Sequence, residues 1–276
     1  MSENRTFIYK IASFFSIYGL NAWWTDAVKQ SFLIKPLIAL SEKVRSASSK
    51  ISLTGAGNFF QIVSFLIALL LFLALGLPQF ANDKIGLALI SSTGLLSWAL
   101  GYLLGGKQKR PLEILDFIVI LYLLIHVISA FSSHYFIPSL KGLAKVIIYI
   151  GSYFFFSTLT AQSRKNALIL LGVLFVTGLL LSFHGLYQYK IGVSPLATWE
   201  DPTVENTGTR IYSTLGNPNL LAGFLIPVVP IGLGFGSYYL AGKNWLLSVL
   251  FYSGSAIITL ACVLTGSRGG YLALFA

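Results

Sequence analysis

The 276 residues are 55% hydrophobic and only 10% charged, whereas a soluble domain carries about 25% charged residues. This balance excludes an ordinary globular enzyme and predicts an all-α, polytopic membrane protein. The formal net charge of +10 does not indicate a nucleic-acid partner, because the basic residues gather at the ends of apolar runs, as membrane orientation requires. The single cysteine, Cys262, lies inside an apolar run, and we interpret it as a small packing residue.

Residues 1–50 form a basic, aromatic segment before the first apolar run. Charged side chains interrupt every stretch here before it reaches the roughly 18 uncharged residues that a span needs. We interpret the segment as an amphipathic helix in the membrane interface, with Trp23 and Trp24 at headgroup depth, and a disordered tail is the alternative. The segment lacks the apolar core and the small-residue cleavage site of a signal peptide.

Seven apolar runs follow, and we interpret each as a membrane-spanning α-helix, since membrane β-barrels use short alternating strands. The sixth run contains Pro227 and Pro230, which predict a kink. An eighth run begins at Tyr271, so we expect a transmembrane domain over residues 51–276 that continues past the last residue. The seven complete spans are predicted over residues 59–80, 85–104, 117–131, 143–160, 167–183, 220–240 and 245–264.

The lysines and arginines of the short loops predict the orientation, because loops rich in them stay in the cytoplasm. With a cytoplasmic N-terminus, most of the 19 basic residues fall on the inner side of the inner (plasma) membrane. Arg210 and Arg268 then both lie on the outer side, as does the long loop over residues 186–216. Loops of this length are usually functional or disordered.

The first candidate site lies where the long loop meets the sixth span, in the stretch Arg-Ile-Tyr-Ser-Thr-Leu-Gly-Asn-Pro-Asn over residues 210–219. Asn217 is a good N-cap and Pro218 suits the first helical position, so a helix is predicted to begin here with unpaired N–H groups at its outer end. Such helix ends bind anions, phosphates in particular. Arg210 adds a planar guanidinium that suits phosphate oxygens. The alternative is an ordinary helix start beside a loop charge.

The second candidate site is the short connection Thr-Gly-Ser-Arg-Gly-Gly over residues 265–270. Ser267 is a candidate cap, and the glycines let a backbone and a ligand come close. Arg268 stands at the end of a span, where an arginine is costly unless it snorkels, pairs or binds a ligand. On its own, Arg268 can equally well be interpreted as a residue that snorkels to the membrane interface or as one that binds a ligand. Together with Arg210 it suits a pyrophosphate at the membrane surface, such as that of a lipid-linked donor.

The stretches over residues 210–223 and 264–274 together resemble the O-antigen ligase and polymerase superfamily. Within it they are most similar to the cyanobacterial IctB-type proteins, which carry the label of bicarbonate transporters. The resemblance covers most of the chain, from about residue 50 to the end. The two motifs are fairly specific as a pair, and each is weak alone.

The resemblance implies a glycosyl transfer on the outer face, from a polyprenyl-pyrophosphate-linked glycan to an acceptor lipid or glycan, with no metal and no cofactor. It implies that Arg210 and Arg268 are catalytic, since outer arginines of this superfamily hold the donor pyrophosphate. It also implies a catalytic histidine after a large outer loop, which we expect beyond residue 276. The remaining residues expected to bind substrate are Asn217, Asn219, Ser267 and His184.

Two other functions stay open. Bicarbonate is an anion that two arginines can bind, so an inorganic-carbon transporter of the IctB type is the alternative, although transporters usually bind substrate near the midplane between repeated halves and no repeat is evident. An inactive, truncated membrane protein is the third interpretation.

We interpret Glu200, Asp201 and Glu205 as solvated loop carboxylates, with a role as general base as the alternative. No residues have metal-ligand spacing, and nothing in the sequence indicates an oligomeric state.

Overall fold

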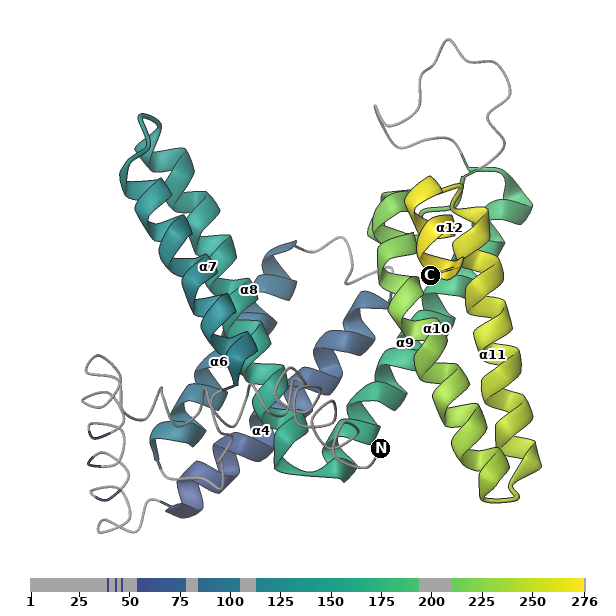
Figure 1. The fold of residues 1–276 in the computed structure, drawn as a ribbon, viewed down its shortest axis with the longest axis horizontal. Helices are drawn as coiled ribbons and strands as arrows, with labels where there is room; N and C mark the ends of the chain where they lie inside the picture. Colours follow the sequence, from purple (N-terminus) through teal and green to yellow (C-terminus); the bar gives the residue numbers. More distant parts are fainter. Residues whose placement is uncertain are drawn as a thin grey trace, which may run out of the picture. The chain divides into compact units, whose positions relative to one another are not determined.

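The computed structural model describes residues 54–77, 84–104, 113–193 and 210–275, together with Ala39, Lys43 and Ser46. These residues form helices and short connections and contain no strand (Figure 1). The predicted all-α class is therefore confirmed for the part of the chain that is described. Apart from the three single positions, the predicted interfacial segment at residues 1–50 lies outside the described residues, and so do the acidic residues of the long loop.

Seven of the helices are long and apolar enough to cross a membrane, so the chain is an integral membrane protein with lipid around it. They correspond one to one with the seven predicted spans. The eighth predicted run is the short helix α12. The elements are α4 Thr54–Leu75, α6 Lys84–Leu103, α7 Ile114–Phe131, α8 Phe136–Gln162, α9 Arg164–Ile191, the 3₁₀ helix η1 Ser213–Leu215, α10 Pro218–Ala241, α11 Trp245–Leu264 and α12 Arg268–Phe275.

Two helices extend by several residues beyond the apolar runs that predict them. Helix α8 begins at Phe136 rather than at residue 143, and helix α9 ends at Ile191 rather than at residue 183. The first residues of the predicted loop at 186–216 are therefore helical. The predicted bounds follow the apolar runs and leave out the polar residues that flank them, yet a lysine such as Lys190 can remain in a helix because its long stem carries the ammonium group toward water.

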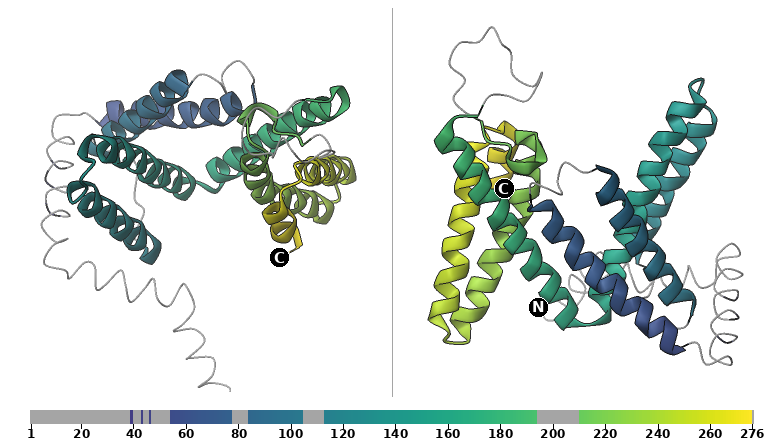
Figure 2. Two further views of the ribbon diagram at one scale, coloured as in Figure 1. Left: turned by 90° about the horizontal axis from the view of Figure 1, so that it is seen from above. Right: turned by 180° about the vertical axis from the view of Figure 1, so that it is seen from behind.

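The chain divides into two compact units. Unit 1 comprises residues 1–66 and 91–164, and unit 2 comprises residues 67–90 and 165–276. Helices α4 and α6 each contribute to both units, whereas α7 and α8 belong to unit 1 and α10, α11 and α12 belong to unit 2. Figure 2 shows the helices from two further sides.

In unit 1, the antiparallel helices α7 and α8 lie side by side and share one buried polar pair. The carboxylate of Asp116 is 1% exposed and accepts a hydrogen bond of 2.8 Å from the hydroxyl of Tyr153 on α8. Its other oxygen accepts from the backbone N–H of Glu113 at 2.7 Å, which caps the start of α7. This carboxylate therefore has a structural role at a helix N-terminus, where a negative charge is favourable.

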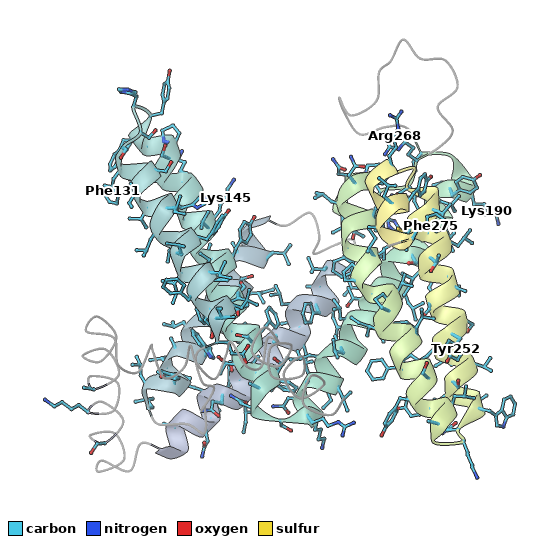
Figure 3. The ribbon with its side chains drawn as sticks, viewed as in Figure 1. Phe131, Lys145, Lys190, Tyr252, Arg268 and Phe275 are labelled. Atoms are coloured by element: carbon cyan, nitrogen blue, oxygen red, sulfur yellow. The ribbon has the colours of Figure 1, made fainter. Side chains whose placement is uncertain are left out.

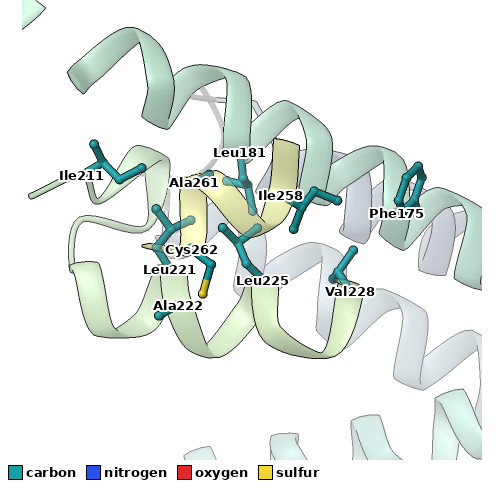
Figure 4. Packing of buried hydrophobic residues seen from close by; sticks show 10 residues of the cluster. All are labelled: Phe175, Leu181, Ile211, Leu221, Ala222, Leu225, Val228, Ile258, Ala261 and Cys262. Carbon is teal, nitrogen blue, oxygen red and sulfur yellow. The ribbon is translucent and has the colours of Figure 1, made fainter. Parts of the chain in front are cut away.

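In unit 2, the antiparallel helices α10 and α11 pack closely because glycines line their contact. The Cα of Gly232 faces Ser255 and the ring of Phe175, and the hydroxyl of Ser248 donates to the carbonyl oxygen of Gly236 at 2.9 Å. A cluster of buried apolar side chains joins these helices to α9 and includes the cysteine that was predicted to pack (Figure 4). The cluster consists of Phe175, Leu181, Ile211, Leu221, Ala222, Leu225, Val228, Ile258, Ala261 and Cys262.

Candidate functional site

Helix α10 begins where the sequence predicts it. The side-chain oxygen of Asn217 accepts hydrogen bonds from the backbone N–H groups of Asn219 at 2.8 Å and Leu220 at 3.4 Å. Pro218 occupies the first helical position, where its missing N–H costs nothing. Gly216 precedes the cap with a φ of 69°, a left-handed conformation that glycine adopts freely. The N-cap role of Asn217 is therefore confirmed.

The second motif forms a capped turn between α11 and α12. The hydroxyl of Ser267 accepts a hydrogen bond from the backbone N–H of Gly270 at 3.2 Å, so Ser267 caps α12 as predicted. The hydroxyl of Thr265 accepts from the N–H of Ser267 at 3.2 Å and donates to the carbonyl oxygen of Cys262 at 2.7 Å. The turn is fixed by these bonds, which sets the position of Arg268 at the first residue of α12.

Arg210 binds directly to this turn. Its Nε donates to the carbonyl oxygen of Thr265 at 2.9 Å, and the next backbone N–H, of Ile211, donates to the carbonyl oxygen of Leu264 at 3.3 Å. Gly266 makes room for the arginine, because a Cβ at that position would lie 3.0 Å from the Nε of Arg210. The two arginine motifs, far apart in the sequence, therefore meet at one end of unit 2, called here the arginine end.

Arg268 and Lys190 lie at the same end of unit 2 as Arg210. Figure 3 shows Arg268 at the start of α12 and Lys190 near the end of α9, both at this end. Both side chains are exposed, whereas that of Arg210 is half-buried. The described part of unit 2 contains no aspartate or glutamate, so it contributes cations and no carboxylate to this end. Positively charged side chains such as these attract anions from solution.

Below the arginine end, helices α10 and α11 border an open groove of about 580 Å³. Its walls are mainly apolar and carry no charged residue, so the groove suits a hydrocarbon chain. The groove extends along α11 from Tyr252 to Val263, which is near the turn that binds Arg210. It is lined by Val229, Leu233, Tyr252, Ser255, Ala256, Thr259, Leu260 and Val263.

His184 contacts the segment that follows Arg210. Its Nδ1 lies 3.3 Å from the hydroxyl of Ser213, which itself donates to the carbonyl oxygen of Leu181 at 2.8 Å. Four residues further along α9, Gln188 binds the same segment through three hydrogen bonds. Gln188 is not among the site residues that the sequence predicts. The available signal was a second polar side chain one helical turn after His184, on a mainly apolar helix.

The other predicted substrate-binding residue is less directly involved. The side chain of Asn219 is exposed on the first turn of α10, and only its backbone N–H takes part in the cap. Among the described residues no group of three histidines, cysteines or carboxylates is placed to hold a metal ion.

Comparisons of the chain with models of known protein families, with curated proteins and with solved structures found no match. The resemblance to the O-antigen ligase and polymerase superfamily therefore stays a prediction that rests on the two motifs.

Proposed function

We propose that this protein is a glycan ligase or polymerase of the O-antigen type, which binds a polyprenyl-pyrophosphate-linked glycan at the arginine end of unit 2. The observation that carries the proposal is the hydrogen bond from Arg210 Nε to the carbonyl oxygen of Thr265, three residues before Arg268. It joins Arg210 of the first motif to the turn of the second motif that leads into Arg268.

The chemistry of a pyrophosphate donor matches these groups. When a sugar leaves its carrier, negative charge builds up on the departing pyrophosphate, and positive groups fixed in advance at that position lower the barrier. Arginine suits this role because its planar fork binds two phosphate oxygens at once. The outer end of α10 adds the partial positive charge of a helix N-terminus. The glycan would pass to an acceptor lipid or glycan, and this form of charge stabilisation requires no metal ion.

The lipid part of the donor also has a matching surface. The groove between α10 and α11 is mainly apolar and reaches Val263, close to the turn that holds Arg210. A polyprenyl chain in this groove would lie in the hydrocarbon layer while its pyrophosphate lies at the arginine end. An anionic head joined to a long apolar tail fits this arrangement better than a small, fully polar anion does.

The proposed orientation places the N-terminus in the cytoplasm and the arginine end outside the plasma membrane. The basis is the distribution of lysine and arginine among the short loops. Lys243, between α10 and α11, and Lys165, near the start of α9, mark the cytoplasmic side of unit 2 under this proposal. The donor would then be used after its transfer across the membrane.

The proposal is tested by neutralising one exposed cation at each end of unit 2. In the complete protein, which would include the histidine expected beyond residue 276, Arg268→Gln should abolish glycan transfer in cells and weaken the binding of undecaprenyl pyrophosphate in lipid nanodiscs about tenfold or more, while insertion into the membrane is unchanged. Lys243→Gln is the matched control, because Lys243 is also exposed but lies in the turn between the far ends of α10 and α11. Equal effects of the two variants, or full transfer by Arg268→Gln, would contradict the proposal.

A transport assay provides the second test. Proteoliposomes that contain only this protein should not accumulate bicarbonate, because the cations lie at helix ends rather than near the midplane, where transporters usually bind their substrates. Bicarbonate uptake that Arg268→Gln abolishes would replace glycan transfer with transport as the function of this site.

A further inference from the structure

Gln188 makes three hydrogen bonds to the backbone of two consecutive residues. Its Oε1 accepts from the N–H groups of Tyr212 at 3.1 Å and Ser213 at 2.7 Å. Its Nε2 donates to the carbonyl oxygen of Ser213 at 3.2 Å. Gln188 is only 6% exposed, so water has little access to take over these bonds. One side chain therefore satisfies three backbone groups that would be costly to leave buried and unpaired.

The backbone that Gln188 binds has an unfavourable conformation. Ser213 has a φ of 50°, in the left-handed region that residues with a Cβ seldom adopt. Such a conformation persists only where the surrounding structure fixes it. The hydroxyl of Ser213 helps to fix this conformation by donating to the carbonyl oxygen of Leu181 at 2.8 Å, and Gln188 binds both the N–H and the carbonyl oxygen of Ser213.

The residues that hold this segment share one face of α9. Leu181, His184 and Gln188 follow one another at spacings of three and four, which places them on the same side of a helix. Gly185 lies on this face too, and a Cβ there would lie 2.8 Å from the Cδ1 of Ile211. The face therefore contacts residues 211–213, which come directly after Arg210.

We propose that Gln188 is a positioning residue that fixes the backbone after Arg210 and thereby directs the guanidinium of Arg210 toward the turn before Arg268. The chain from Arg210 to Ser213 is short, so a shift of the held residues moves the arginine as well. This inference rests on the proposed function, because the group that Arg210 is positioned to bind is the donor pyrophosphate.

The test uses two substitutions of Gln188 and one matched control, each in the full chain in phosphatidylcholine nanodiscs. Gln188→Met keeps the length of the side chain and removes all three hydrogen bonds. Gln188→Glu keeps the acceptor oxygen and removes the donor to Ser213. Gln61→Met is the control, because Gln61 is also buried within a span and its Nε2 has no hydrogen-bond partner among the described residues.

The first measurement needs no ligand. Hydrogen exchange, followed by mass spectrometry of a peptide that covers residues 211–216, should be about tenfold faster in Gln188→Met and unchanged in Gln61→Met. Gln188→Glu should show an intermediate rate. If the amide hydrogens of this peptide exchange in Gln188→Met at the same rate as in the unsubstituted protein, the inference is overturned, whether or not the protein binds a pyrophosphate.

The second measurement is a double-mutant cycle with undecaprenyl pyrophosphate as the probe. Gln188→Met should weaken binding about tenfold in the unsubstituted protein but less than about twofold when Arg210 is already alanine, because a residue that acts through Arg210 has no effect without it. Tenfold losses in both backgrounds would overturn the positioning role and indicate general damage to the fold. If the unsubstituted protein does not bind the probe, the proposed function is contradicted, while hydrogen exchange still decides whether Gln188 holds the backbone.

Discussion

The Nε of Arg210 donates a hydrogen bond of 2.9 Å to the carbonyl oxygen of Thr265, although 55 positions separate the two residues in the chain. A bond through Nε fixes the plane of a guanidinium as well as its position, because the group is flat and rigid. Lysine has one ammonium group in place of the fork and cannot reproduce this arrangement. The bond therefore sets both the place and the direction of a cation at the arginine end.

The space for this bond depends on Gly266. Its φ of 63° is left-handed, which costs alanine about 1–2 kcal/mol, and a Cβ would lie 3.0 Å from the Nε of Arg210. Gly266→Ala should therefore displace the arginine and weaken the binding of undecaprenyl pyrophosphate about tenfold. Binding is measured by titration in nanodiscs. Gly269→Ala is the control, since a Cβ at Gly269 meets nothing within 4 Å. Equal affinities of the two variants would argue against a role for Arg210 in binding.

The sequence predicted the spans well because membrane helices carry a strong signal: each is a long apolar run. It predicted their ends less well. The start of α8 and the end of α9 lie beyond the apolar runs, because lysines such as Lys141 and Lys190 interrupt an apolar run but are still compatible with a helix. The start of α10 was predicted correctly, since Asn217 followed by Pro218 is a local signal that needs no tertiary information.

The candidate site was predictable in part. The two arginine motifs are visible in the sequence, and the orientation of the spans predicts that they lie on the same side of the membrane. The contact of Arg210 with Thr265 is not visible, because it depends on how α9, α10 and α11 pack together. Gln188 was missed for the same reason: a glutamine in an apolar helix has no recognisable role until the segment that it binds is known.

The close approach of α10 and α11 depends on Gly232. A Cβ at this position would collide with the hydroxyl of Ser255 and the ring of Phe175, so Gly232→Ala should force the helices apart and lower the free energy of unfolding by about 1–3 kcal/mol. Gly234→Ala is the matched control two residues away, where a Cβ meets nothing within 4 Å. It should be neutral or stabilising by up to about 1 kcal/mol, because alanine favours a helix over glycine. Reversible unfolding in mixed micelles measures both, and equal values would contradict the packing described for α10.

The pair of α7 and α8 in unit 1 depends on the hydrogen bond between Tyr153 and Asp116. A bond to a charged group contributes about 1.5–3 kcal/mol, and Asp116 is almost fully buried. Tyr153→Phe should therefore lower the free energy of unfolding by about 2 kcal/mol in the same unfolding assay. Tyr149→Phe serves as the control, because Tyr149 lies one turn earlier on α8 and is 69% exposed. If both substitutions have no effect, the bond contributes little to the association of the two helices.

Two substitutions of Asn217 distinguish the effect of the helix cap on stability from the effect of charge on anion binding at the arginine end. Its side chain caps α10, so Asn217→Ala should lower the free energy of unfolding by about 1 kcal/mol. Asn217→Asp should unfold like the unsubstituted protein, since aspartate is an equally good cap and its charge is favourable at a helix N-terminus.

The aspartate variant should nevertheless bind undecaprenyl pyrophosphate about three- to tenfold more weakly at low salt, because it places a negative charge beside the cations that attract the anion. The difference in affinity between the unsubstituted protein and the aspartate variant should shrink as salt is raised. Salt screens the interaction between exposed charges, with a Debye length of about 10 Å at 0.1 M ionic strength. If the aspartate variant is as stable as the unsubstituted protein and binds undecaprenyl pyrophosphate as tightly at every salt concentration, no anion binds near the start of α10. A loss of binding that salt does not change would indicate a rearranged loop rather than charge repulsion.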